Sequence, residues 1–306
     1  MPQRLLIELD KRQAEWVVTA YAAPDERMID VCESNRDPHT ATGVLISGAP
    51  EDFIRAEHKL VGHLTDPLEV AEARQPLLLS AGRNASSWFL PRSMSIRQAG
   101  KKSNHGLNYG MGYKRFSLEN ELDESEGRRC VEAYHRAYPG LRGSYYTAVQ
   151  RQLKEDRTLE NCFGRRRRFL DAWGEDLFKE AYSFIPQSTV VDVVNRAIIQ
   201  AYKDPRNWMR RLELLAQVHD SVLFQYPLNN LPDMTMAVKQ FADYMTPTIN
   251  YHGRDFVIYT DVKIGLTWGN MYEVKAAINS DKLEEALRET LELIHGSAQT
   301  KRLATS

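Results

Sequence analysis

The sequence predicts a mixed α/β fold for this chain of 306 residues. An apolar run predicts a short buried strand over residues 4–9, directly before Asp10. A second apolar stretch, residues 214–226, predicts two strands folded about His219 and Asp220. Between these regions apolar residues recur at helical spacing. A chain of this length can bury the core of one large or two modest domains.

Composition excludes several classes of protein. The net charge is −1, so any affinity for nucleic acid must come from a local basic surface. Cys32, Cys130 and Cys162 are scattered without a C-x2-C pair, which argues against a zinc site or a disulfide framework and favours a reducing compartment. No apolar run approaches about eighteen residues, and no leader-like segment opens the chain, so we expect an intracellular protein without a membrane partner.

The N-terminal elements are predicted as follows. Residues 13–21 are expected to be helical, a break follows at Pro24, and a second helix is expected over residues 26–33. Residues 47–92 are the least regular part of the chain and contain four prolines. Amphipathic pieces near residues 51–62 and 67–74 predict short helices there.

Four side chains then recur at a spacing of four: Arg97, Lys101, His105 and Tyr109. On a helix they follow one face, with two cations before two rings. Such a face suits a nucleoside triphosphate, because cations bind phosphates and rings stack on sugar and base. The alternative is an amphipathic helix with a solvated polar face. Ser93 or Ser95 is the expected N-cap of this helix.

Downstream elements follow from periodicity. We expect helices over residues 118–141, 145–156, 182–201, 233–245 and 279–295, a hairpin over 159–170, a strand over 254–265, and a flexible tail over 299–306.

Three stretches in this order, residues 5–16, 97–110 and 214–226, resemble motifs A, B and C of family A DNA polymerases, the DNA polymerase I type. The resemblance extends from about residue 5 to about residue 268. It implies a palm whose antiparallel sheet carries Asp10 and Asp220, backed by helices, and a mainly helical fingers region. The expected domains are palm 1–45, fingers 46–145 with an insertion at about 47–92, palm 146–274, and a C-terminal helix with a flexible tail at 275–306.

The resemblance implies a DNA-directed DNA polymerase that adds dNTPs to a primer 3′-hydroxyl by a two-metal mechanism. It assigns Asp10 and Asp220 as catalytic metal ligands, with the backbone carbonyl of Lys11 as a further ligand. The expected cofactor is two Mg²⁺ ions, with Mn²⁺ as a substitute. Considered alone, an aspartate at a strand end is usually a turn residue. The expected location is the cytoplasm of a bacterium or a phage-infected cell.

The resemblance also implies a nucleotide pocket. Arg97 and Lys101 would bind the triphosphate, and Lys101 could protonate the leaving pyrophosphate. Glu15 and Tyr109 would form a gate against a ribose 2′-hydroxyl. His39 would point toward the triphosphate; alternatively it lies in the cap region of the following helix. The full expected dNTP-binding set is Gln13, Glu15, His39, Arg97, Lys101, His105 and Tyr109.

Primer–template DNA is the expected macromolecular partner. By resemblance, Gln187 contacts the minor groove at the primer terminus and His219 contacts the terminus itself. Arg165 and Arg166 belong to a run of four arginines that is expected to contact the phosphate backbone. The alternative for this run is a solvated charged surface.

Three positions depart from the family pattern. His105 replaces a Phe or Tyr against the sugar and base, so sugar selectivity and fidelity are open. Ser221 replaces the acid that usually follows the motif C aspartate, and its effect is open. Val17 stands at the position of a family arginine.

The family's thumb and exonuclease-like regions lie upstream of the first motif, so we expect either a longer or split polymerase or a partner polypeptide that supplies the thumb. Two alternatives stay open: a single-subunit RNA polymerase relative, and a non-catalytic remnant that binds nucleic acid or another subunit. The sequence leaves open the role of residues 47–92, the identity of any partner, activity of the chain alone, and a replication or repair role.

Overall fold

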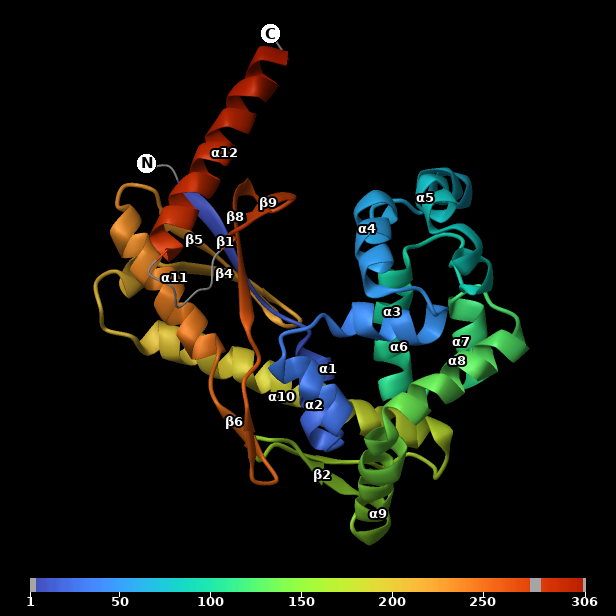
Figure 1. Cartoon of the computed structure of the whole chain (residues 1–306). Helices are drawn as coiled ribbons and strands as arrows, with labels where there is room; N and C mark the ends of the chain where they lie inside the picture. The colour runs from blue at the N-terminus through green and yellow to red at the C-terminus, as the bar shows by residue number, and fades with distance from the viewer. Residues whose placement is uncertain (1–3, 276–281, 305–306) are drawn as a thin grey trace. The chain divides into compact units, whose positions relative to one another are not determined.

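The computed structural model describes residues 4–275 and 282–304 (Figure 1). It divides into two compact units, Met1–Ala14 with Ser188–Ser306, and Glu15–Gln187. The predicted mixed α/β class is confirmed, with helices more abundant than strands. Among the described helices, none has both the length and the apolar character that a membrane crossing needs.

The first unit is built on a five-stranded sheet with the order β4-β5-β1-β8-β9. All neighbouring strands in it are antiparallel, as the resemblance implies. Its strands are β1 (Arg4–Lys11), β4 (Glu213–Val218), β5 (Ser221–Pro227), β8 (Thr260–Thr267) and β9 (Asn270–Glu273). The predicted continuous strand over 254–265 is wrong: β7 (Arg254–Phe256) pairs instead with β6 (Ile249–Tyr251) in a separate hairpin, and β8 begins at Thr260.

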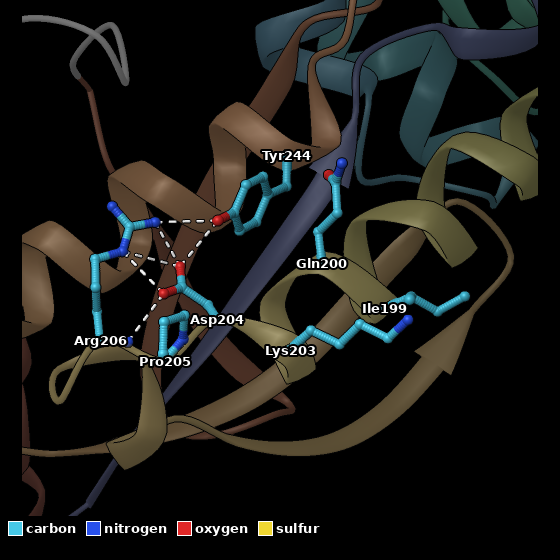
Figure 2. Close-up of a pocket in the computed structure, with 7 residues that line it drawn as sticks. All are labelled: Ile199, Gln200, Lys203, Asp204, Pro205, Arg206 and Tyr244. Atoms are coloured by element: carbon cyan, nitrogen blue, oxygen red, sulfur yellow. Dashed lines mark hydrogen bonds and ion pairs between the residues drawn. The ribbon is translucent and has the colours of Figure 1, made fainter.

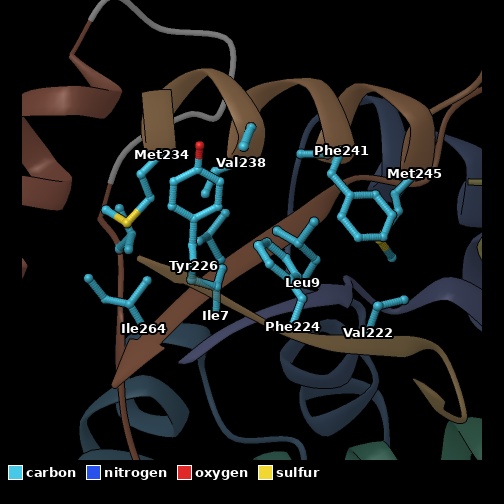
Figure 3. Close-up of a cluster of buried hydrophobic side chains, with 14 of the residues drawn as sticks. Ile7, Leu9, Val222, Phe224, Tyr226, Met234, Val238, Phe241, Met245 and Ile264 are labelled. Atoms are coloured by element: carbon cyan, nitrogen blue, oxygen red, sulfur yellow. The ribbon is translucent and has the colours of Figure 1, made fainter. Parts of the chain in front are cut away.

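The core of this unit lies on one face of the sheet. Alternation along β1 buries Leu5, Ile7 and Leu9 completely. They belong to one cluster with Phe224 of β5 and Phe241 of helix α11 (Leu231–Met245), which lies over these strands in Figure 3. Because side chains alternate along a strand, Glu8 and Asp10 project from the opposite face.

Helix α12 (Leu283–Ala304) follows β9 after the undescribed residues 276–281. The predicted start at residue 279 lies outside the described residues, and the helix continues past the predicted end at residue 295. The part of the expected flexible tail up to Ala304 is therefore helical, and residues 305–306 lie outside the described residues.

The second unit is mainly helical. Its elements are α1 (Ala14–Ala22, which begins in the first unit), α2 (Glu26–Glu33), α3 (Pro38–Ser47), α4 (Glu51–Val61), α5 (Pro67–Ala81), η1 (Gly82–Ser87), α6 (Ile96–Asn108), α7 (Tyr113–Glu119), α8 (Glu124–Ala137), η2 (Leu141–Tyr146), α9 (Thr147–Glu155), β2 (Thr158–Glu160) and β3 (Arg166–Arg168).

A long helix, α10 (Glu175–Lys203), contributes residues to both units, and the short η3 (Met209–Arg211) follows it. The predicted start at residue 182 is wrong, because the helix begins at Glu175 and contains Pro186 in its interior. The predicted helix already contained Pro186, and α10 passes through this residue although proline lacks the N–H that an interior position donates.

Helices α3 and α6 of the second unit pack closely. A Cβ on Gly100 would lie 2.1 Å from the His39 carbonyl oxygen and 2.9 Å from the Gly43 nitrogen, so only glycine permits this approach. Asn104 of α6 donates a hydrogen bond to the Pro38 carbonyl at 3.1 Å and accepts one from the Thr42 hydroxyl at 2.7 Å.

Residues 47–92 hold the start of α6 in place. Arg74 of α5 is buried and donates two hydrogen bonds to the buried carboxylate of Glu57 in α4, at 2.7 and 3.0 Å. Arg74 also donates to the carbonyl of Met94 at 2.8 Å, and Glu57 accepts from the backbone N–H of Ile96 at 3.1 Å. At the same end, Ser95 forms a capping box with Gln98, which confirms one of the two predicted caps.

The buried pair gives a stability prediction. Arg74→Met should lower the free energy of unfolding by about 3–5 kcal/mol, because it leaves the Glu57 carboxylate buried without its partner. Arg55→Met is the matched control: Arg55 pairs with Glu51 on the surface of the same helix, α4, and its loss should cost under about 1 kcal/mol. Chemical denaturation measures the free energy of unfolding of both variants. Equal losses in the two variants would contradict a stabilising role for the buried Arg74–Glu57 pair.

Candidate functional site

Asp10 and Asp220 lie at the same end of two paired strands in the first unit. The last pair in the register of β1 and β5 is Asp10 with Ser221, and Asp220 directly precedes Ser221. The backbone N–H of Lys11 donates to the Asp220 carbonyl at 3.3 Å. His219 forms the turn between β4 and β5 with a left-handed backbone (φ 54°) and an exposed side chain. The strand register thus brings the two predicted metal ligands next to one another.

The Lys11 side chain is an anchor inside this unit. It is 4% exposed, and Nζ donates to the Ile258 carbonyl at 2.7 Å, to Thr260 Oγ1 at 3.0 Å and to the Met245 carbonyl. Burial lowers the pKa of Lys11 to about 7, although the charge of Asp220 acts in the other direction. Sequence reasoning assigned only the backbone of this residue.

A network on the open face of the sheet surrounds Asp10. Lys263 of β8 donates to Asp10 Oδ2 at 3.2 Å and to Glu8 Oε1 at 2.9 Å. Trp268 donates its indole N–H to the other oxygen of Glu8 at 2.8 Å. Lys263, Glu8 and Trp268 were not predicted as site residues, because the contacts of Lys263 with Glu8 and Asp10 depend on the register of β1 and β8.

The donor set fits one class of metal site. Within residues 4–275 and 282–304, no three or more His, Cys, Asp or Glu side chains form a group that could hold a metal. Asp10 and Asp220, whose backbones lie at the same end of two paired strands, provide carboxylates with hard oxygen donors. Mg²⁺ is typically held by one or two carboxylates together with waters and substrate phosphates. The residues present therefore fit a magnesium site shared with substrate rather than a cage of protein ligands.

Arg97 and His39 meet in the second unit. Arg97 of α6 donates to both oxygens of Asp37, at 2.7 and 3.1 Å, and Asp37 also caps α3 through the Thr40 N–H. Burial alone would raise the pKa of Asp37, but the bonds from Arg97 and Thr40 lower it. His39 lies 3.2 Å from Asn104, and burial lowers its pKa to about 4. Lys101, one turn further along α6, is exposed.

Glu15, His105 and Tyr109 also lie together in this unit. The buried hydroxyl of Tyr109 donates to Glu15 Oε2 at 2.5 Å, and His105 Nδ1 lies 3.7 Å from the same oxygen. Burial and then the Glu15 charge raise the pKa of Tyr109. The His105 and Tyr109 rings pack edge to face at 5.6 Å. The contact between Glu15 and Tyr109 that the resemblance implies is present.

Two hollows differ in their content. One of about 460 Å³ in the second unit is lined by His105 and Tyr109 together with the charged side chains of Lys114, Arg115, Glu175 and Lys179. Another, in the first unit, surrounds an Asp204–Arg206 ion pair that also binds the Tyr244 hydroxyl (Figure 2). This second hollow contains none of the predicted site residues.

The remaining predicted residues lie on the surface or between elements. Arg165 and Arg166 are exposed in the β2–β3 hairpin, where Arg166 pairs with Glu160 at 2.6 Å. Gln187 is half-buried in α10. Gln13 follows β1 with a left-handed backbone (φ 53°). Their contacts with DNA or nucleotide stay predictions.

Comparison with known proteins identifies relatives of one kind. The profile of DNA polymerase family A matches residues 84–270. The chain is 25% identical over 252 residues to the thermostable DNA polymerase I of Thermus aquaticus, covering 79% of this chain and 25% of that protein. It is 24% identical over 265 residues to DNA polymerase theta of Drosophila melanogaster, covering 79% of this chain and 12% of that protein.

A solved structure shares the fold. The POL domain of Pol1 from M. smegmatis, in complex with DNA primer-template and dNTP, aligns with a TM-score of 0.63 at 19% identity. The alignment covers 86% of this chain and 40% of that one.

The chain spans about a quarter or less of the length of the two polymerases that it matches in sequence.

The buried Lys11 gives a prediction for the pH dependence of stability. Its pKa of about 7 lies below that of an unfolded lysine, about 10.4, so between these values the unfolded chain binds more protons. Stability from this group should therefore rise as pH increases from about 7 to about 10. Denaturation of the wild type and Lys11→Met across this range should show the rise only in the wild type. Parallel pH profiles would refute an uncharged Lys11 at high pH.

Proposed function

The chain belongs to DNA polymerase family A, and from this premise we propose that it carries the palm and fingers that perform template-directed DNA synthesis, adding dNTPs to a primer 3′-hydroxyl. The observation that carries the proposal is the placement of Asp10 and Asp220 side by side at the ends of paired strands. The proposed parts are palm 1–45 and 146–274, fingers 46–145 with the insertion at about 47–92, and a C-terminal segment at 275–306.

Asp10 and Asp220, with the Lys11 carbonyl, would hold the divalent ions. Two such ions, when bound, stabilise the attacking and leaving oxygens of an in-line displacement. Because the protein offers two carboxylates, water and the dNTP must complete the coordination. We propose Mg²⁺ as the usual ion and Mn²⁺ as a substitute.

Arg97 and Lys101 would bind the triphosphate, and Lys101 would donate a proton to the pyrophosphate that leaves. In the structure Asp37 holds Arg97 by a bidentate ion pair, which orients its guanidinium before a nucleotide binds. His39 would meet the triphosphate as a neutral ring, because burial lowers its pKa to about 4.

Glu15 and Tyr109 would form the sugar gate. Their hydrogen bond fixes both side chains, and fixed groups reject an extra hydroxyl more strongly than mobile ones. His105, in edge-to-face contact with Tyr109, would supply a further ring beside the nucleotide. Gln13 would support the same pocket.

Arg165, Arg166, Gln187 and His219 are proposed to contact primer–template DNA. The neighbour that shares the fold is a polymerase bound to primer-template and dNTP, which supports these partners. Since the matched relatives are longer than this chain, we also propose that thumb contacts come from further sequence or from a separate polypeptide.

The metal assignment predicts that Asp220→Asn lowers single-nucleotide extension of a primed DNA template with Mg²⁺ by about a hundredfold to a thousandfold or more, the cost of losing an electrostatic contact to the transition state. The thermal midpoint should stay close to that of the wild type, because Asp220 lies in a partly exposed turn. Asp233→Asn, on α11, is the matched control and should extend normally. Extension at the wild-type rate by Asp220→Asn would refute the metal assignment. If neither the wild type nor any folded variant extends the primer, even with excess template, the non-catalytic alternative is favoured.

The gate predicts that Glu15→Ala lowers the preference for dNTP over rNTP by about tenfold or more, as expected when a pocket loses a defining group. The measurement is the ratio of incorporation efficiencies for one base. Glu33→Ala removes a similar carboxylate, 3.5 Å from the Tyr21 hydroxyl in the same unit, and should leave the ratio unchanged. An unchanged ratio in Glu15→Ala would remove Glu15 from the gate.

A further inference from the structure

Lys263 lies across the sheet from two carboxylates. The register of β1 and β8 pairs Lys263 with Glu8 and pairs Asp10 with Asp261. From this position the Lys263 ammonium reaches Glu8 Oε1 at 2.9 Å and, diagonally, Asp10 Oδ2 at 3.2 Å. One cation thus occupies the carboxylate that the proposed function assigns to a divalent metal.

The surroundings keep Lys263 in this place. Glu8 is largely buried, with 13% of its side chain exposed, and the Trp268 indole holds its second oxygen. The Lys263 ammonium is the hydrogen-bond donor in both contacts, to Glu8 and to Asp10. Asp261, the cross-strand neighbour of Asp10, is paired with Arg12 and does not draw Lys263 away.

We propose that Lys263 is an exchangeable counter-ion of Asp10, a positioning residue that a divalent cation must displace before it can bind the carboxylate. The inference rests on the proposed function, in which Asp10 is a metal ligand. The displaced ammonium keeps its bond to Glu8, so the exchange needs only a small movement of one side chain. In the absence of metal, Lys263 reduces the repulsion between Asp10 and its acidic neighbours.

A purely structural role is the competing explanation. In that case the ion pair joins β1 to β8, and its loss changes stability without changing metal affinity. The counter-ion role makes a different demand, because removing the ammonium must tighten metal binding. Metal affinity therefore separates the two roles, whereas stability does not.

The test is a titration of the full chain with Mn²⁺ alone, in which the electron paramagnetic resonance signal of the free ion reports binding. Lys263→Gln should bind Mn²⁺ roughly three- to tenfold more tightly, since a charge-assisted hydrogen bond to Asp10 no longer competes. Lys263→Arg keeps the charge and should bind like the wild type. Lys239→Gln, a half-buried lysine of the same unit on α11, changes the net charge equally and should shift the affinity by less than about twofold.

A double-mutant cycle isolates the role of Glu8. In Glu8→Gln, Asp10 is the one carboxylate of the two that Lys263 can still pair with. Lys263 then competes more strongly with the metal, so Mn²⁺ should bind several-fold more weakly than to the wild type. Part of this loss would come from the missing negative charge. The contribution of the missing charge persists in the Lys263→Gln background, whereas the contribution of competition by Lys263 disappears. Glu8→Gln must therefore lower Mn²⁺ affinity less in the Lys263→Gln background than in the wild type.

Asp10→Asn separates the two levels of inference. If it abolishes Mn²⁺ binding but Lys263→Gln and Lys263→Met bind Mn²⁺ like the wild type, the metal assignment stands and the counter-ion proposal is overturned. If Asp10→Asn leaves Mn²⁺ binding unchanged, the metal assignment fails and the counter-ion proposal fails with it. Lys263→Met keeps the aliphatic stem and replaces the Gln variant if circular dichroism shows that variant to be unfolded.

Discussion

Strand β1 is hydrogen-bonded along both edges, to β5 and to β8, and the candidate site of the first unit depends on this double pairing. Side chains alternate along a strand, so a slip of one residue would turn Asp10 into the core and Leu9 to solvent. The cost of exposing the three buried aliphatic residues of β1 therefore maintains the register. The same register sets Asp10 beside the Asp220 turn on one side and beside Lys263 on the other.

Elements with a strong local signal could be predicted from the sequence. The apolar run of β1, the bounds of α2 at Glu26–Glu33 and the Ser95 cap of α6 all agree with the structure, because each depends on neighbours within a few residues. The errors arise where local rules compete with packing. The helix predicted to start at residue 182 begins at Glu175, and the alternation over 254–265 concealed the break between β7 and β8.

The candidate site also contains residues that could be predicted from the sequence and residues that could not. The resemblance to family A polymerases supplied Asp10, Asp220, Arg97, Lys101 and the pair of Glu15 with Tyr109, although their catalytic roles stay predictions. It could not supply Lys263 or the Asp37 partner of Arg97. Those contacts depend on how strands are registered and how α3 meets α6, and charged residues at such positions look like an ordinary solvated surface in the sequence. Residues 47–92 looked irregular for a related reason: their main stabilising pair, Glu57 and Arg74, joins two helices and is buried.

The contact between α3 and α6 limits how the second unit can move. Gly100 leaves no space between the helices, and Asn104 bonds across them. The two helices therefore behave as one rigid body, and any swing of α6 must carry Asp37 and His39 along with Arg97. Hinges for such a swing must lie outside this helix pair, in the connections that lead into α3 and out of α6. Arg97, Asp37 and His39 would then move together and keep their mutual geometry.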